Sequence, residues 1–248
     1  MLFRSKRDDK ELIEALQGLA FKHPSYGFRK FFAYLRRSGK PWNHKKVYRV
    51  YKLLKLNKKR RGKRRLPARV KQPLLQQEQI NNSWSMDFMS DSLMGIRKFR
   101  TFNVMDDCSR EALAIEIDTS LSSKRIIRTL ERIIEQRGKP KTIRTDNGPE
   151  FTSKDFELWC KEQGIENQYI QPGKPMQNGY IERFNRLYRE AILDAYVFMD
   201  LEEVRYLTRE WIEEYNYRRP HEALNNLTPD EWKRNLEITE IHKSTTVC

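Results

Sequence analysis

The sequence contains few of the residues that build disulfide frameworks, zinc sites or membrane spans. Its three cysteines and four histidines are widely separated along 248 residues, and no CxxC motif occurs. This spacing argues against both a disulfide framework and a zinc domain. No apolar run approaches the roughly 18 residues of a membrane-spanning helix, and the basic start is not followed by the apolar segment of a signal peptide. We therefore expect a cytoplasmic protein that does not contact a membrane.

Acidic residues are scarce only in the N-terminal third of the chain. Residues 1–75 contain 24 Lys or Arg and 4 Asp or Glu (24 − 4 = +20), whereas residues 76–248 contain 25 and 30 (25 − 30 = −5), and the two sum to the net charge of +15. A strongly basic region attracts polyanions. The imbalance therefore predicts that the N-terminal region binds nucleic acid.

Three short amphipathic helices are predicted within residues 1–57. Apolar residues recur at helical spacing after Glu11 and after Tyr26, and a third helix begins after Asn43, a favourable N-cap. Three helices with a basic last one are typical of a helix-turn-helix, whose last helix enters the major groove of DNA. A solvated helix face is the alternative for each basic residue. The candidate DNA contacts are Lys45, Lys46, Arg49 and Lys52.

A basic linker is predicted over residues 58–80. Seven of the eight residues 58–65 are Lys or Arg, and such a block repels itself and does not fold alone. Each DNA phosphate that it neutralises should add to the salt dependence of binding. The candidate backbone contacts are Lys58, Lys59, Arg60, Arg61, Lys63, Arg64 and Arg65.

From residue 81 onward, alternating apolar patterns predict an α/β domain over residues 81–200. Three antiparallel strands followed by a βαβα order indicate a mixed sheet with helices on its faces. Further helices near 201–217 and 229–235 form a C-terminal helical extension over residues 201–248. The strands are expected near 83–90, 98–106, 111–118, 141–145 and 165–169, and the core helices near 121–137, 153–163 and 178–198.

Three acidic residues occur in contexts that suit a metal-dependent nuclease. Asp87 follows a strand-like entry, Asp146 ends another strand, and Glu182 lies in a helix after 182 − 146 − 1 = 35 intervening residues. Two strand ends and one helix can converge on a pair of Mg²⁺ ions, which prefer oxygen ligands and promote phosphodiester cleavage. Solvated carboxylates, and a simple turn after Asp146, are the alternatives.

Basic residues near Glu182 are candidates for contacts with DNA phosphates. Arg186 and Arg189 lie four and seven residues after Glu182 and so share its helical face. A guanidinium matches phosphate geometry, although an ion pair between Glu182 and Arg186 is the alternative. Lys174, in a proline-stiffened loop before this helix, is a further candidate. Asp106 and Asp107 also end a strand and are rival carboxylates.

Four motifs together resemble a known family. They are WSMDF at residues 84–88, TDNGPEF at 145–151, QPGKPMQNGYIERFN at 171–185, and YNYRRPHEAL with LTP at 215–229. These segments are similar to the catalytic core of bacterial insertion-sequence transposases of the IS-three family, relatives of retroviral integrases. The resemblance covers about residues 26–232.

The resemblance implies an RNase H-like integrase core after a small helix-turn-helix-like domain. It implies that Asp87, Asp146 and Glu182 are both the catalytic residues and the ligands of two Mg²⁺ ions, with Mn²⁺ as a candidate replacement and no other cofactor. Asp106 and Asp107 then have structural roles. The implied reaction is hydrolysis of one strand at each element end, followed by attack of the freed 3′-hydroxyl on a phosphodiester.

The resemblance also implies partners. These are the DNA of element ends and target, further copies of the chain assembled on DNA, and the product of an upstream reading frame that family members fuse to this one. Bound to DNA, the protein would associate with the bacterial nucleoid. Two other functions stay open: a DNA-binding regulator with an idle core, and an RNase H-like nuclease that cleaves without joining.

Overall fold

The structure, a computed structural model, describes residues 9–57, 79–95, 97–170 and 178–245. The chain divides into two compact units, Met1–Arg69 and Val70–Cys248. The predicted linker lies almost wholly outside the described residues, so its role stays a prediction. No described helix is long and apolar enough to cross a membrane.

The first unit is a bundle of three helices, as the apolar spacing predicts. Helices α1 (Lys10–Lys22), α2 (Phe28–Arg37) and α3 (His44–Leu53) enclose one apolar core. Asn43 caps α3, because its side chain accepts a hydrogen bond from the Lys45 backbone N–H at 2.9 Å. The unit packs through buried aliphatic and aromatic side chains, among them Leu12, Leu16, Phe31, Leu35, Val47 and Val50.

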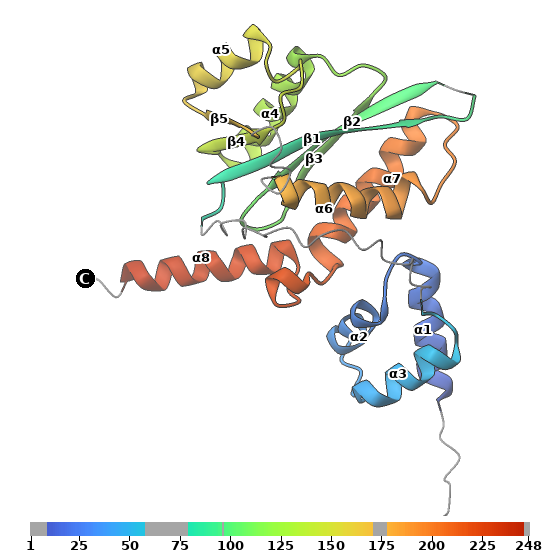
Figure 1. Cartoon of the computed structure of the whole chain (residues 1–248). Helices are drawn as coiled ribbons and strands as arrows, with labels where there is room; N and C mark the ends of the chain where they lie inside the picture. Colours follow the sequence, from blue (N-terminus) through green and yellow to red (C-terminus); the bar gives the residue numbers. More distant parts are fainter. Residues whose placement is uncertain (1–8, 58–78, 96, 171–177, 246–248) are drawn as a thin grey trace, which may run out of the picture. The chain divides into compact units, whose positions relative to one another are not determined.

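The second unit is built on a mixed five-stranded sheet (Figure 1). Its strands are β1 (Ser83–Ser92), β2 (Lys98–Asp106), β3 (Ala112–Asp118), β4 (Thr142–Thr145) and β5 (Glu166–Tyr169), in the spatial order β3-β2-β1-β4-β5. The first three strands pair antiparallel, whereas β4 and β5 pair parallel to β1. This is the predicted mixed sheet.

Helices cover both faces of the sheet and enclose a separate core on each side (Figure 1). Helices α4 (Ser123–Arg137) and α5 (Lys154–Gln163) pack on the face that carries Trp84, Met86 and Phe102. Helices α6 (Gly179–Tyr188) and α7 (Leu201–Glu213) pack on the face of Met89 and Met105. Alternate residues of β1 therefore point into different cores, as a strand requires.

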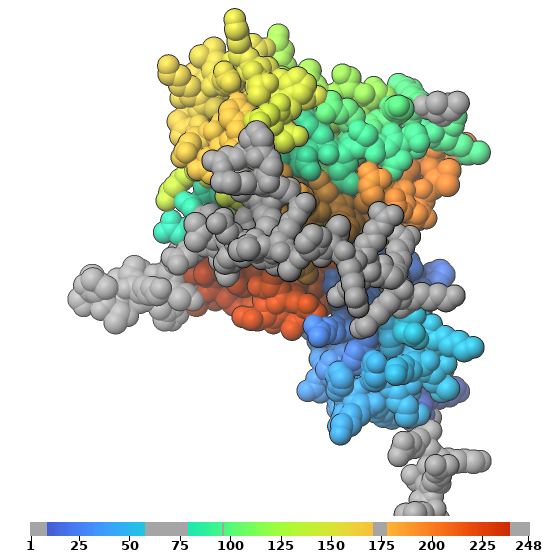
Figure 2. All heavy atoms as spheres, in the orientation of Figure 1, coloured from blue at the N-terminus to red at the C-terminus, as the bar shows by residue number. Residues whose placement is uncertain are grey.

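The second core joins the predicted catalytic core to the predicted C-terminal extension. Trp211 of α7 and Tyr215 of the π-helical turn η3 (Glu214–Arg218) are buried with Phe184 of α6. In the space-filling view, α6 and α7 lie directly against the hairpin of β1 and β2 (Figure 2). The short η4 (Glu222–Leu224) and the helix α8 (Pro229–Thr245) complete the unit.

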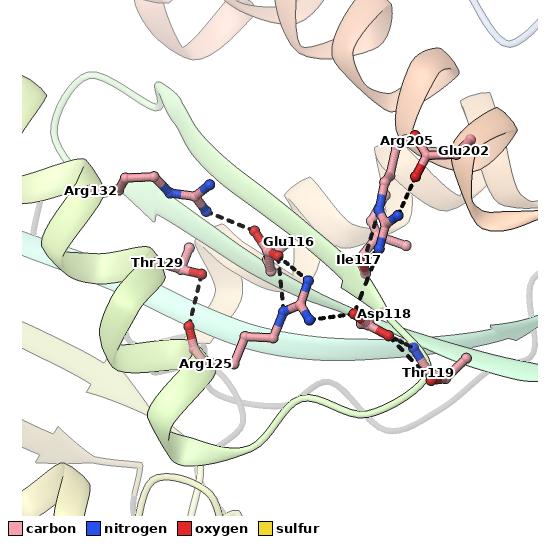
Figure 3. Close-up of polar contacts among 9 residues, drawn as sticks. All are labelled: Glu116, Ile117, Asp118, Thr119, Arg125, Thr129, Arg132, Glu202 and Arg205. Atoms are coloured by element: carbon pink, nitrogen blue, oxygen red, sulfur yellow. Dashed lines mark hydrogen bonds and ion pairs between the residues drawn. The ribbon is translucent and has the colours of Figure 1, made fainter.

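A network of ion pairs covers the edge strand β3 (Figure 3). Arg125 of α4 bonds Glu116 at 2.9 Å and also pairs with Asp118, both on β3. From the other side, Arg205 of α7 donates to the Ile117 backbone carbonyl at 2.9 Å and lies 3.6 Å from Asp118. The network ties helices from both faces to one strand and caps a carbonyl at the sheet edge.

The observed helices differ from the predicted ones at two ends. The predicted helix 178–198 ends earlier, since α6 passes into the π-helical turn η2 (Arg189–Leu193) and a loop follows. In that loop Phe198 is buried in the α6 and α7 core, and Asp200 then caps α7 by accepting from the Glu203 backbone N–H. The last helix is longer than predicted, because its second half has too few apolar residues at helical spacing to mark it.

Candidate active site

The structure brings Asp87, Asp146 and Glu182 together on the α6 side of the sheet. Asp87 lies within β1, and the parallel pairing of β1 with β4 includes the pair Ser85 and Arg144. Asp87 and Asp146 each lie two residues beyond this pair along their own strand direction. They therefore occupy equivalent positions and face the same side of the sheet. Glu182 projects from the first turn of α6, which packs on that side.

The negative charges of Asp146 and Glu182 both act on the carboxylate of Asp87. The pKa of Asp87 is raised from 3.8 to about 6, first by burial and then by the negative charges of Asp146 and Glu182. Hydrogen bonds from the Phe88 backbone N–H and from Asn185 oppose this rise. Asp87 is half-buried, whereas Asp146 and Glu182 are exposed. The three residues concentrate negative charge around Asp87.

The position of Asp146 is fixed by the turn that follows β4. Its Oδ1 accepts a hydrogen bond from the Gly148 backbone N–H at 3.0 Å. A Cβ added at Gly148 would lie 3.0 Å from the same oxygen and 3.4 Å from Glu150 Oε2. A side chain at this position would require the Asp146 carboxylate to shift by a few tenths of an ångström. The hydrogen bond itself is that of an Asx turn, so the alternative of a simple turn stays open.

Four side chains from different elements hold the loop between Asp146 and Phe151. Arg100 of β2 pairs with the Glu150 carboxylate, and its guanidinium stacks 4.3 Å above the ring of Phe88. The loop backbone is held by three hydroxyls. Ser123 and Ser153 donate to the Glu150 carbonyl at 3.0 Å each, and Tyr169 donates to the Phe151 carbonyl at 2.9 Å.

Helix α6 places a second polar residue against Asp87. Asn185 follows Glu182 by three residues, and its Nδ2 donates to Asp87 Oδ2 at 2.8 Å. The sequence shows Asn185 on the same helical face as Glu182 but gives no sign of its partner. The contact with Asp87 joins residues 98 positions apart, which only the packing of α6 on β1 brings together.

The two candidate arginines of this helix have different surroundings. Arg186 is exposed, and among the described residues neither it nor Glu182 makes a side-chain ion pair, so the alternative of a Glu182–Arg186 pair does not apply there. Arg189 is engaged within the protein, since it donates to the Ser90 carbonyl at 3.1 Å and lies 3.6 Å from Asp91. Of the two, only Arg186 is exposed.

The rival carboxylates Asp106 and Asp107 are buried and fully used in holding the fold. Asp106 accepts from the backbone N–H groups of Asn81, Cys108 and Ser109. Asp107 accepts from the hydroxyls of Ser83 and Ser85 and pairs with Arg144 at 3.1 Å. The interpretation of both as structural residues agrees with these contacts.

In the first unit, the candidate DNA contacts of α3 lie along one basic face. Lys45, Arg49 and Lys52 are exposed. Arg49 bonds Asp9 at 2.6 Å and Lys46 lies 3.6 Å from the same carboxylate, which holds the pKa of Asp9 below its usual value through the Arg49 hydrogen bond. The remaining candidates lie outside the described residues: Lys58, Lys59, Arg60, Arg61, Lys63, Arg64, Arg65 and Lys174.

Comparison with known proteins gives three family matches. Residues 77–175 and residues 163–229 each match a family described as "Integrase core domain", and residues 6–64 match one described as "HTH-like domain". The chain is 38% identical over 233 residues to the "Insertion element IS476 uncharacterized 39.2 kDa protein" of Xanthomonas euvesicatoria, covering 94% of this chain and 67% of that one. It is 37% identical over 225 residues to the "Insertion element IS407 uncharacterized 31.7 kDa protein" of Burkholderia multivorans, covering 91% and 81%.

The chain belongs to the IS-three family of insertion-sequence transposases, with an integrase-like core. Membership places the protein in DNA transposition. It also confirms the resemblance seen in the sequence motifs, three of which contain Asp87, Asp146 and Glu182.

A solved structure confirms the fold of this transposase. The HTLV-2 integrase catalytic core domain in complex with magnesium aligns with a TM-score of 0.50 at 20% sequence identity, covering 63% of this chain and 97% of that one. The second unit is therefore an RNase H-like integrase core, as predicted, and the first unit matches the predicted helix-turn-helix-like class.

Proposed function

We propose that this transposase cleaves one DNA strand at each end of its insertion sequence and joins the freed 3′-hydroxyl to a second phosphodiester, with Asp87, Asp146 and Glu182 as its catalytic residues. The observation that carries the proposal is the convergence of these three carboxylates from β1, the end of β4 and α6. Its support is membership of a transposase family with an integrase core.

The same three residues suit divalent cations. Burial, and then the negative charges of Asp146 and Glu182, raise the pKa of Asp87, and a bound cation would offset both effects. Among the described residues, no group of three or more His, Cys, Asp or Glu side chains is arranged to hold a metal ion, so the three carboxylates would have to draw closer around one. Magnesium keeps several waters, so a few carboxylate contacts are enough to hold it. Asp87, Asp146 and Glu182 would hold two Mg²⁺ ions, with Mn²⁺ as a candidate replacement.

When bound, such ions would stabilise the oxygen that attacks the phosphodiester and the oxygen that leaves it. The related HTLV-2 catalytic core forms a complex with magnesium, which supports the same class of cation here. The protein's own residues supply position. Asn185 orients Asp87, and the turn at Gly148 orients Asp146. Both reaction steps are in-line phosphoryl transfers, and neither requires a covalent bond between protein and DNA.

Contacts with DNA are proposed for both units. Arg186 is exposed on the Glu182 face of α6 and would bind a phosphate beside the reacting strand. Lys45, Lys46, Arg49 and Lys52 would bind DNA from α3, and the basic segment 58–65 would clamp its backbone. We also propose that the active form is an oligomer assembled on element ends and that it includes the product of the upstream reading frame.

The test is a cleavage and joining assay on labelled element-end DNA with Mg²⁺, with and without the upstream-frame product. Glu182→Gln, Asp87→Asn and Asp146→Asn should each abolish joined products. Glu190→Gln is the matched control, because Glu190 is an exposed glutamate in the following turn η2, eight residues after Glu182, with no side-chain partner among the described residues.

Each outcome of that assay has a distinct meaning. Joining by the wild type and by Glu190→Gln, lost in the three site variants, supports the proposal. Cleavage without joining would replace it with a nuclease. Binding of DNA without either reaction, under all conditions, would replace it with a regulator whose core is idle.

A further inference from the structure

A chain of two buried asparagines lies behind Asp87. Asn185 donates its Nδ2 to Asp87 Oδ2 at 2.8 Å, and Asn103 donates its Nδ2 to Asn185 Oδ1 at 2.7 Å. Asn103 has no exposed surface and Asn185 is 7% exposed. These hydrogen bonds therefore connect Asn103 in the sheet, through Asn185 of helix α6, to the carboxylate of Asp87.

The strand register explains why Asn103 can take part. Asn103 of β2 is the direct cross-strand partner of Asp87 of β1, so both side chains leave the sheet on the same face. Asn185 of α6 packs against both of these residues. One amide thus bridges a strand and a helix, and the other amide sits beside the carboxylate without touching it in any hydrogen bond that the structure shows.

Only one orientation of the Asn185 amide lets it donate a hydrogen bond to Asp87. A side-chain amide carries a donor at one end and an acceptor at the other, and the two ends are nearly the same size. Asn185 could therefore turn its oxygen toward Asp87, which would place two acceptors against each other. The Nδ2 group of Asn103 prevents this by donating to the oxygen of Asn185. The NH₂ group of Asn185 must then face the carboxylate of Asp87.

In this arrangement one polar atom of Asn103 lacks a hydrogen bond. Its own Oδ1 is buried and has no hydrogen-bond partner in the structure. A buried polar atom without a partner lowers stability, and a leucine at this position would avoid that loss. A buried amide that lowers stability in this way requires a reason other than packing.

We propose that Asn103 is a positioning residue for the strand-transfer site, fixing the orientation of the Asn185 amide and, through it, the Asp87 carboxylate. This inference rests on the proposed function. It assigns Asn103 no contact with DNA or with the reacting atoms.

The first test is Asn103→Leu, which removes the donor and the unsatisfied oxygen together. Cleavage of element-end DNA at saturating concentration should slow about tenfold, as is usual when a residue that orients a catalytic ligand is lost. The DNA concentration that gives the half-maximal rate should stay unchanged, and the unfolding midpoint should stay equal or rise.

Thr101→Val is the matched control. Thr101 lies two residues away on the same strand and face, has no exposed surface, and its hydroxyl also lacks a hydrogen-bond partner in the structure. The substitution removes an equally buried polar atom that does not lead to Asp87. Its cleavage rate should equal that of the wild type.

A second readout does not depend on activity. The side-chain NH₂ signals of Asn185, assigned by their loss in Asn185→Ala, should exchange slowly with solvent in wild-type protein. In Asn103→Leu they should shift and exchange faster, whereas in Thr101→Val they should stay in place.

The outcomes separate this inference from the proposed function. Wild-type cleavage and unmoved Asn185 signals in Asn103→Leu would overturn the inference. A change in the unfolding midpoint alone, with the cleavage rate per folded molecule unchanged, would also overturn it. Full activity of Asp87→Asn would instead overturn the proposed function. If Asn103→Leu does not fold, Asn103→Ala loses the same donor without any clash and is judged by the same two readouts.

Discussion

Asp146 and Gly148 are fitted to each other, since the carboxylate of one accepts from the backbone N–H of the other at 3.0 Å and fills the space where its Cβ would stand. In Gly148→Ala the new methyl must displace the Asp146 carboxylate. We expect strand cleavage to fall by about tenfold to a hundredfold, because small displacements of a catalytic group have effects of this size. Cleavage kinetics measure the change.

Gly18→Ala is the control for that substitution. Gly18 lies within α1, and no atom lies within 4 Å of an added Cβ. Alanine there should stabilise the helix by roughly 0.5–1 kcal/mol and leave cleavage unchanged. Equal activity of Gly148→Ala and the wild type would mean that the fit at Asp146 does not matter for catalysis.

The raised pKa of Asp87 predicts a pH-dependent cost in stability. Its pKa rises from 3.8 to about 6 on folding, so the folded state holds the proton more tightly. The contribution of Asp87 to stability is therefore greatest below about pH 4 and is lost as the pH rises to about 6. Asp87→Asn removes this loss. It should unfold at a higher temperature than the wild type at pH 8 and at nearly the same temperature at pH 4.

Thermal unfolding at a series of pH values, without divalent cations, checks this prediction. Glu190→Gln, which changes an exposed carboxylate, should follow the wild-type curve. If Asp87→Asn runs parallel to the wild type over the whole range, burial and the charges of Asp146 and Glu182 do not raise the pKa of Asp87 as described.

Arg205 should contribute to the stability of the core without taking part in the reaction. It binds the Ile117 carbonyl and Asp118 at the end of β3 (Figure 3). Arg205→Met should lower the free energy of unfolding by about 1–2 kcal/mol, since it leaves a carbonyl and a carboxylate with fewer partners. Arg209→Met, one turn later on an exposed position of α7, should change it by less than about 0.5 kcal/mol. Denaturant unfolding of both variants decides the point.

Lys45 should contribute to DNA affinity through charge alone. It is exposed in the first turn of α3. If it contacts one phosphate, Lys45→Ala should lower the slope of log affinity against log salt concentration by roughly 0.9, equally for specific and unrelated DNA. Lys22→Ala, which changes an exposed lysine at the end of α1, should keep the wild-type slope. A slope unchanged in Lys45→Ala would favour the solvated-face interpretation.

The sequence predicts the elements of the core well because their signals are local. Apolar residues at every second position, Trp84, Met86 and Phe88, mark β1, and Asn43 marks the start of α3 through its own side chain. The start of α7 is less visible. Residues 194–199 carry apolar side chains that suggest a continuing helix, but Phe198 enters the core from a loop, and tertiary packing decides the outcome.

The three carboxylates proposed as catalytic are predictable from motifs, but the residues that support them are not. Asn103 and Asn185 meet across 82 positions, and Arg100 meets Glu150 across 50. Neither pair has a local pattern, since each depends on how β2 lies beside β1 and on how a helix or loop then packs over them. Arg189 shows the opposite case, because a face shared with Glu182 suggests DNA, whereas the structure gives it partners on β1.

The parallel pairing of β1 with β4 has a consequence for refolding. Asp87 and Asp146 face the same side only while Ser85 is paired with Arg144. A slip of one residue would turn Asp146 to the opposite side, although the helix content and compactness of the molecule would hardly change. Recovered activity after denaturation would therefore report on strand alignment, which circular dichroism does not detect. The reaction itself can serve as a probe of whether a refolded sample has reached its native arrangement.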